Sequence, residues 1–485
     1  MTAQRTLVLA CAGALLTALY ATASMRMPLI AYFHSSQTTV DFVHMLGPGW
    51  QWPTVLYLTF VGAAFALYAA ALAVVWQGIR IPRLALFGFP VLFALALMPM
   101  YPPTAVDMFH YHALGRAFWV FGANPLTTPQ GTLPYPIGMS WADLPSPYGP
   151  LWSLLVAPAS VLPGEHFEAG LLAFKAMAAL SYLGCAALIW RTVCATRLGE
   201  ESLAVVLFAW NPFVLLRTVG NGHNDLWMLL FVLLAFETAR QRRWTPAVLF
   251  LTLSVVLKFA SALLGPPLLL YIWTHSSGTR RERLALLGSA LACAFAIALA
   301  VYAPFWAGLD TFKGLLLQSR LMITSTPVLL DVLFARVLDA VTAAEMARVL
   351  PTAVFLVLYV ALVRQAGQSF AHLVVFSFTI LFLYLLLATS WFRPWYMLWP
   401  VTLAALRPRS WLAPTLLSIT IAASVPDLVE QFRGYWPWLA PYERAIAAPI
   451  LLAFLPPLIV WLVGVFRHDG WGLDARPDIE EAVLG

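Results

Sequence analysis

Apolar runs of roughly 20 residues recur along this chain, and short polar turns separate them. About 20 mainly apolar residues in a helix are enough to cross a bilayer core of roughly 30 Å, so each run is a candidate transmembrane helix. The pattern predicts fourteen spans, which are residues 7–25, 54–78, 84–100, 171–190, 202–219, 225–239, 246–258, 260–274, 284–306, 347–365, 370–389, 396–408, 411–425 and 446–466.

Some of the predicted spans are short or interrupted by proline, as in residues 246–274 with Pro266-Pro267. Non-helical backbone at membrane depth is tolerated only where protein buries it or where it lines a cavity. The segment Tyr148–Pro163 is too short for a span, and we expect a re-entrant or interfacial helix there. The first run lacks a cleavage site of small residues, so we interpret it as a retained span, equivalent in appearance to an uncleaved signal anchor.

The composition agrees with a membrane protein. Of the 485 residues, 61% are hydrophobic and 10% are charged, with a mean hydropathy of +0.81. A soluble fold needs a charged surface, which this composition cannot supply. No basic run is long enough to indicate nucleic-acid binding. The four cysteines lie in or beside apolar runs without metal-type or disulfide-type spacing, which is typical of small buried side chains.

Arginine-rich turns predict the orientation. They contain Arg80, Arg83, Arg191, Arg197, Arg240, Arg242, Arg243, Arg280, Arg281, Arg283, Arg407 and Arg409, and Arg467 follows the last span. Placing them on the cytoplasmic side follows the positive-inside rule and puts both termini inside. The outer segments are then residues 26–53, 101–170, 220–224, 307–346, 390–395 and 426–445.

These patterns together predict an all-α polytopic membrane protein. We expect a bundle of about 12–14 transmembrane helices in one domain, residues 1–466, and a short cytoplasmic tail at residues 467–485. The first large extracytoplasmic loop, residues 101–170, is expected to carry interfacial helices. Every ionisable cluster that resembles a chemical site falls in the outer segments.

The first such cluster is Val106–Arg116, which places an acid, two histidines and an arginine just after a span. With Thr104 as N-cap, a helix would put Asp107, His110, Tyr111 and Leu114 on one face. Asp107 then either has a catalytic role or is simply an acidic residue at the start of a helix. His110 and His112 do not share a face, and no metal motif accompanies them, so no metal site is expected.

The second cluster runs from Trp210-Asn211-Pro212 through Arg217 to Gly222-His223-Asn224-Asp225. Glycines allow close approach of the backbone, while His, Asn and Asp supply donors and acceptors. A plain tight turn between two spans is the alternative. That turn would not need both a histidine and an aspartate, so we favour a functional role.

Two basic residues, Lys258 and Arg393, complete the set of candidate site residues. Lys258 lies in an apolar stretch, and a charge inside a membrane is functional by default. Its expected partner is an anionic substrate group or Asp225, and snorkelling to the interface is the alternative. Arg393, between aromatic residues, suits a bidentate contact with phosphate. Because the chain has no P-loop and no G-x-G-x-x-G after a strand, a lipid-linked donor is favoured over a cytosolic nucleotide.

Several motifs together are similar to those of a known family. They are Asp107, Tyr111, Gly115-Arg116, Asn124-Pro125, Ser146-Pro147-Tyr148-Gly149-Pro150, Trp210-Asn211-Pro212, Gly222-His223-Asn224-Asp225 and Pro394-Trp395-Tyr396-Met397-Leu398-Trp399-Pro400. Over residues 100–405 the chain resembles bacterial GT-C fold glycosyltransferases, especially polyprenol-phosphate-mannose-dependent α-mannosyltransferases. It departs from them at Phe109-His110, His112 and Leu126.

The resemblance implies an inverting transfer of a sugar, with mannose expected, from a polyprenyl-phosphate donor to a glycan or lipid-linked acceptor. Asp107 would be the general base. The other residues expected to bind substrate are His110, Tyr111, Arg116, Tyr148, Arg217, His223, Asn224, Asp225, Lys258, Arg393, Trp395 and Tyr396. The enzyme would lie among the lipids of a bacterial inner membrane, with its site on the extracytoplasmic side. No cofactor is implied, and a divalent cation stays an open possibility.

Two other classes remain. A transporter or flippase for a lipid-linked or anionic substrate would use Lys258 and Asp225 as intramembrane charges and would tolerate a neutral residue at Asp107. A polymerase or ligase with a pyrophosphate-linked donor would use extra arginines in the outer loops, such as Arg320, Arg336 and Arg348.

Overall fold

The computed structural model describes residues 2–30, 51–134, 142–162, 164, 166–426, 429 and 441–467. In these residues all regular secondary structure is helical, and β-structure is limited to isolated bridges such as that between Pro28 and Met100. The prediction of an all-α membrane protein is therefore confirmed.

Each predicted span coincides with one or more helical segments. They are α1 (Thr2–Arg26), α4 (Gln51–Trp76), α5 (Arg83–Leu97), α9 (Phe167–Thr196), α10 (Glu201–Ala209) with α11 (Pro212–Leu215) and η2 (Leu216–Gly220), α12 (Asp225–Arg240), α13 (Trp244–Leu257), η3 (Phe259–Leu264) with α14 (Gly265–His275), α15 (Arg280–Tyr302), α18 (Ala340–Ala366), α19 (Phe370–Leu383) with η6 (Tyr384–Ala388), η7 (Pro394–Met397) with α20 (Leu398–Ala404), α21 (Leu412–Ala422) and α23 (Tyr442–Arg467).

Fewer helices than predicted are long enough to cross a bilayer alone. Within the described part of the chain, seven helices meet the length and hydropathy of a span, and a pair bent by 51°, α10 with α11–η2, makes an eighth. The sixteen residues of α12 rise only about 24 Å. Half of the predicted segments are thus short or broken helices. Two of the breaks, at Lys258 and Pro394, lie beside the site described below.

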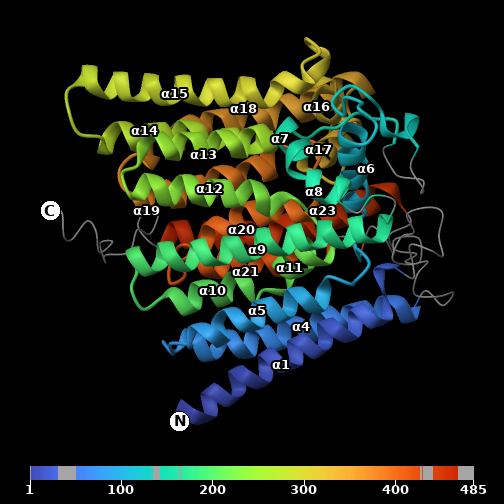
Figure 1. Ribbon diagram of the computed structural model, residues 1–485, viewed down its shortest axis with the longest axis vertical. Coiled ribbons are helices and arrows are strands. Elements are labelled where there is room, and N and C mark those ends of the chain that lie inside the picture. The colour runs from blue at the N-terminus through green and yellow to red at the C-terminus, as the bar shows by residue number, and fades with distance from the viewer. Residues whose placement is uncertain are drawn as a thin grey trace.

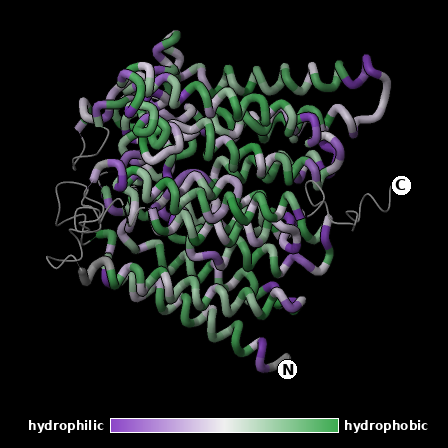
Figure 2. The backbone as a smooth tube through the Cα atoms, turned by 180° about the vertical axis from the view of Figure 1, so that it is seen from behind, coloured by the Kyte–Doolittle hydropathy of each residue, from purple (hydrophilic) through white to green (hydrophobic). Residues whose placement is uncertain are grey.

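The helices run side by side, and the two ends of the bundle differ in character (Figure 1). At one end lie α6 (Asp107–Trp119), α7 (Pro150–Leu155), α8 (Ala157–Val161), α16 (Lys313–Arg320) and α17 (Thr326–Phe334). The arginine-rich turn from α14 to α15 lies at the opposite end. Hydrophobic residues dominate the middle of the bundle, and hydrophilic residues gather at its two ends (Figure 2).

The segment Tyr148–Pro163, whose last residue lies outside the described residues, contains the short helices α7 and α8. With α6 they are the α-helices that the structure describes between residues 101 and 166. They pack against α9 and α13, so this end of the bundle is covered by protein.

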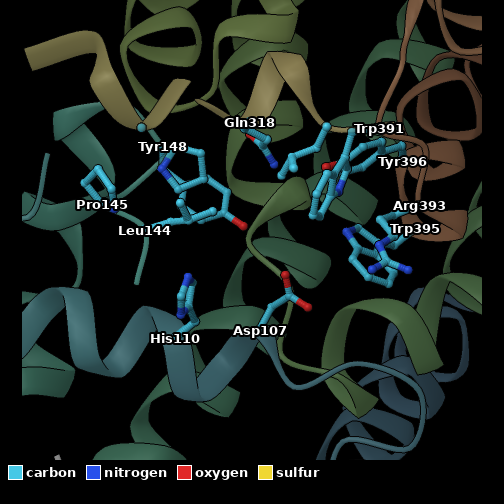
Figure 3. A pocket seen from close by; sticks show the side chains of 13 residues that line it. Asp107, His110, Leu144, Pro145, Tyr148, Gln318, Trp391, Arg393, Trp395 and Tyr396 are labelled. Atoms are coloured by element: carbon cyan, nitrogen blue, oxygen red, sulfur yellow. The ribbon is translucent and has the colours of Figure 1, made fainter. Parts of the chain in front are cut away.

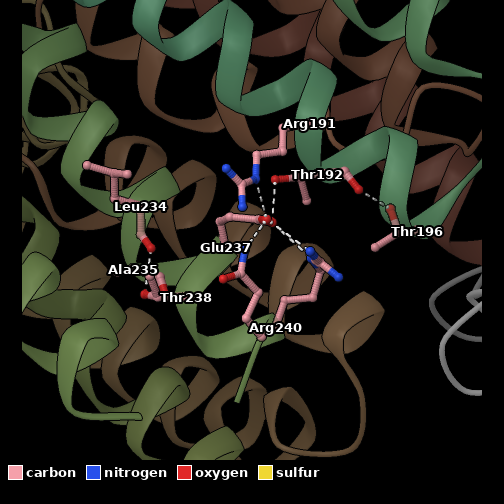
Figure 4. A network of polar contacts seen from close by, with 9 residues as sticks. Arg191, Thr192, Thr196, Leu234, Ala235, Glu237, Thr238 and Arg240 are labelled. Atoms are coloured by element: carbon pink, nitrogen blue, oxygen red, sulfur yellow. Dashed lines mark hydrogen bonds and ion pairs between the residues drawn. The ribbon is translucent and has the colours of Figure 1, made fainter. Parts of the chain in front are cut away.

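A network of hydrogen bonds and ion pairs around the buried Glu237 joins α9 to α12 at the arginine-rich end (Figure 4). Glu237 accepts hydrogen bonds from Arg240 at 2.8 Å and from Thr192 and Arg191 at 3.1 Å each. A buried carboxylate is costly unless it is paired, and these donors meet that need. This network lies away from both cavities described next and serves the packing of the bundle.

Candidate active site

Asp107 is the first residue of α6 and lines an open cavity. In Figure 3, Asp107 and His110 point from α6 into this space, with Tyr148 on one side and Arg393 and Trp395 on another. The full lining is Asp107, His110, Leu144, Pro145, Pro147, Tyr148, Gly314, Gln318, Leu321, Trp391, Arg393, Trp395 and Tyr396. We call this space the Asp107 cavity.

Packing on one side of α6 directs Asp107 and His110 into the cavity. A Cβ atom at Gly115 would lie 2.0 Å from the Ser160 hydroxyl oxygen, so the helix rests directly on α8. On the same side, the His112 ring packs edge-on against Phe167, with ring centroids 4.4 Å apart. The two histidines therefore have different surroundings, as their spacing predicted.

The start of α6 differs from the prediction. The N-cap position is Val106, not Thr104, and it makes no side-chain capping bond. The Thr104 hydroxyl instead accepts hydrogen bonds from Arg217 and from Asn221, the latter at 2.8 Å. The N-cap prediction was wrong because a tertiary contact with the Asn221 turn takes the hydroxyl that local capping would have used.

Two glycines hold Tyr148 beside the cavity. Gly149 donates its N–H to Leu257 at 2.9 Å, and a Cβ atom there would lie 2.0 Å from the Val256 carbonyl oxygen. A Cβ atom at Gly314 would lie 2.1 Å from the Ser146 carbonyl oxygen. The loop that carries Tyr148 is thus pressed between α13 and α16, at distances that no larger residue allows.

A second cavity adjoins the first. It is lined by Pro147, Tyr148, Lys258, Phe259, Ala260, Leu315, Gln318, Ser319, Tyr384, Ala388, Thr389, Ser390, Trp391, Tyr396 and Trp399. We call it the Lys258 cavity. Pro147, Tyr148, Gln318, Trp391 and Tyr396 line both spaces. A molecule that reacts across this shared wall would meet Asp107 on one side and Lys258 on the other.

Lys258 is paired with Asp225, one of the two partners expected for it. Its ammonium nitrogen lies 2.6 Å from Asp225 Oδ1, and the indole N–H of Trp399 donates to the same oxygen at 2.6 Å. Lys258 also faces the rings of Tyr396, Trp399 and Tyr148, with centroids 5.0, 5.5 and 5.7 Å away. An ammonium carries three N–H donors, so Lys258 retains capacity for an anion in its cavity.

The residues around Asp225 support the cavity walls from behind. His223 stacks on Trp395 with ring centroids 4.2 Å apart. Tyr148 donates to the Tyr111 hydroxyl at 3.4 Å, and Tyr111 donates to Asn224 at 3.3 Å. Neither cavity is lined by His223, Asn224, Tyr111 or Asp225. The structure therefore brings them to the site without placing them in either space.

Two of the basic residues expected to bind substrate, Arg116 and Arg217, lie outside the cavities. Arg217 is buried and donates to Thr104 and to the Ala423 carbonyl oxygen, the latter at 3.1 Å. Arg116 donates to the Gly164 carbonyl oxygen at 3.3 Å and lies over the Phe121 ring. Their guanidinium groups contact carbonyl, hydroxyl and aromatic groups of the protein, and neither side chain lines a cavity.

Three other residues of the site were not among those expected to bind substrate, although Trp399 belongs to one of the quoted motifs. Gln318 and Trp391 line both cavities, and Trp399 holds Asp225. Lys175 of α9 is fully buried and donates to the Val219 carbonyl oxygen at 3.0 Å and to Gly220, at the end of the π-helical turn η2. A lysine inside an apolar run was the available signal for Lys175, the same signal that identified Lys258.

The surroundings of Asp107 suit proton transfer. Burial raises the pKa of its carboxyl to about 6, against the opposing effects of Arg393 and Lys258, which lower it. The group is therefore mostly ionised near pH 7 and is a stronger base than an exposed aspartate. Burial also lowers the pKa of His110 to about 4, so this imidazole is neutral at that pH. Among the described residues, no group of three or more His, Cys, Asp or Glu side chains could hold a metal.

One family of known proteins matches the chain. The family model described as "Alpha-(1->6)-mannopyranosyltransferase, N-terminal domain" (MptA_B family) matches residues 7–275, more than half of the sequence. The match includes Asp107, Tyr148, Asp225 and Lys258 and ends before Gln318. No curated protein matches the chain significantly.

Proposed function

Because the chain belongs to the MptA_B family of alpha-(1->6)-mannopyranosyltransferases, we propose that it transfers mannose from a polyprenyl-phosphate donor to a glycan or lipid-linked acceptor. The reaction would take place on the extracytoplasmic side of a bacterial inner membrane. The observation that carries the proposal is the pair of adjoining cavities, one lined by Asp107 and the other by Lys258.

The acceptor sugar occupies the Asp107 cavity. Asp107 takes the proton of an acceptor hydroxyl while that oxygen forms a bond to the anomeric carbon of mannose. The bond from the anomeric carbon to the phosphate oxygen breaks on the opposite face, and its electron pair leaves with the phosphate. The anomeric configuration is inverted. Base catalysis of this kind contributes about 10²–10⁴-fold to a rate.

The donor phosphate lies beside Lys258. Its ammonium group compensates the charge that develops on the leaving phosphate, in a setting where electrostatic stabilisation is strong. Asp225 keeps Lys258 in place at 2.6 Å. Arg393 lines the Asp107 cavity and not the Lys258 cavity, so in this arrangement it faces the acceptor and lowers the pKa of Asp107. The leaving phosphate needs no proton, so one carboxylate is enough, unlike the two carboxyl groups of glycosidases.

The remaining lining suits the two substrates. Trp391, Trp395 and Tyr148 offer aromatic faces against which the apolar faces of sugar rings pack. Phe259, Leu315 and Ala388 give the Lys258 cavity an apolar side for the start of a polyprenyl chain. A lipid-phosphate donor thus meets a cation and an apolar surface in the same space.

The experiment that tests this function supplies membranes containing the protein with radiolabelled polyprenyl-phosphate mannose or nucleotide-linked mannose, together with mannoside acceptors. We expect transfer from the lipid donor alone and a product with an α-linkage. Asp310→Asn, an exposed acid outside both cavities, should behave as wild type. Transport of a lipid-linked substrate without any transfer would contradict the proposal and favour a flippase.

A further inference from the structure

His110 is the next residue of α6 on the face that carries Asp107. Both side chains point into the Asp107 cavity (Figure 3). The Nδ1 atom of His110 is buried and has no hydrogen-bond partner in the protein. A buried polar atom without a partner costs free energy, and native structures keep few of them. Because Nδ1 is closed off from the cavity, a ligand would reach the ring at Nε2, which also makes no hydrogen bond to the described residues.

The position of His110 separates it from the donor. His110, Leu144, Pro145, Gly314 and Leu321 line the Asp107 cavity and not the Lys258 cavity. A phosphate held by Lys258 is therefore on the far side of the shared wall. A ligand group that reaches His110 belongs to the molecule that Asp107 activates.

We propose that His110 recognises the acceptor sugar by hydrogen-bonding a hydroxyl next to the one that Asp107 deprotonates. This inference rests on the proposed function, because it assigns the acceptor to the Asp107 cavity. Side chains three residues apart on a helix have Cβ atoms roughly 5–6 Å apart, a spacing that lets the two groups reach neighbouring hydroxyls of one ring.

The chemistry of the imidazole fits a hydroxyl. Burial keeps His110 neutral near pH 7, so its ring offers one N–H donor and one nitrogen lone pair. A sugar hydroxyl also donates one hydrogen bond and accepts others. A charged side chain so close to Asp107 would change the basicity of the carboxylate, whereas a neutral imidazole binds the acceptor and leaves the base unaltered.

His112 provides a matched control on the same helix. It is buried against Phe167 and Phe174 and lines neither cavity. Replacing His112 removes the other histidine of α6, one that is more deeply buried, without touching the proposed acceptor site. Any effect that His112→Leu shares with His110→Leu reports on folding of α6 and not on recognition.

The test measures steady-state kinetics with polyprenyl-phosphate mannose and a mannoside acceptor. For His110→Leu we expect the acceptor KM to rise about tenfold, as for loss of one hydrogen bond that leaves a partner unsatisfied. The donor KM and kcat should stay within about twofold. Replacement by Asn or Gln, which retain donor and acceptor atoms at the positions of Nδ1 and Nε2, should restore part of the affinity. His112→Leu should leave the acceptor KM unchanged.

A series of acceptors that each lack one hydroxyl makes the test specific. One deoxy acceptor should bind wild type about tenfold more weakly and should lose nothing further with His110→Leu. An unchanged acceptor KM in His110→Leu, or a defect confined to kcat or the donor KM, would overturn the assignment while mannose transfer by wild type stands. Absence of transfer by wild type would instead refute the proposed function, and this assignment with it.

Discussion

Replacing Lys258 with Met leaves the Asp225 carboxylate buried without the cation that it now meets at 2.6 Å. The side chains of Lys258 and Asp225 are 11% and 0% exposed. Removing one partner of such a buried pair typically costs about 3–5 kcal/mol, because the remaining charge is uncompensated. We therefore expect Lys258→Met to unfold at a clearly lower temperature in detergent and to lose mannose transfer.

The double variant Lys258→Met with Asp225→Asn separates the two effects. Its amide oxygen can still accept the Trp399 indole hydrogen bond, and no buried charge remains. Thermal unfolding and equilibrium binding of radiolabelled donor would be measured for wild type, both single variants and the double variant, as a double-mutant cycle. The double variant should recover most of the stability and stay inactive, because the phosphate has lost its cation. Donor affinity equal to that of wild type in either variant without Lys258 would refute the role of this residue.

Two further changes test the surroundings of the site. Activity should require ionised Asp107, so kcat/KM should fall about tenfold per pH unit below the pKa of about 6. Arg393→Gln removes a cation that lowers the pKa of Asp107. The acid limb of the pH profile should therefore move to higher pH in this variant. An unmoved limb would show that Arg393 does not act on Asp107. Gly149→Ala places a methyl group 2.0 Å from the Val256 carbonyl oxygen and should lower folded yield or transfer severely, whereas Gly88→Ala meets nothing within 4 Å and should resemble wild type in size-exclusion and transfer assays.

The helices could be predicted because a bilayer demands long apolar runs, and the sequence displays them directly. Two features of the site followed from equally local rules. Asp107 and His110 share a face because they are three residues apart, and Lys258 needed an anionic partner because an unpaired charge inside an apolar segment is costly. The observed contact with Asp225 satisfies that need.

Other features depend on contacts between distant segments, which a hydropathy pattern does not contain. Arg217 was expected to bind substrate, but it lies in the π-helical turn η2 and donates to Thr104 and Ala423. Gln318 had no chemical signature in α16, and it reaches the cavities because Gly314 lets that helix approach Ser146. Half of the predicted spans are also short or broken helices, and the breaks at Lys258 and Pro394 lie at the cavities.

The assignment of Asp107 as the base is tested most directly by measuring donor binding and mannose transfer in Asp107→Asn. This variant keeps the size of the side chain and removes the proton acceptor. We expect binding of radiolabelled polyprenyl-phosphate mannose to remain close to wild type, while the rate of transfer falls by about 10²–10⁴-fold. Transfer at a near-normal rate by folded Asp107→Asn protein would contradict the account.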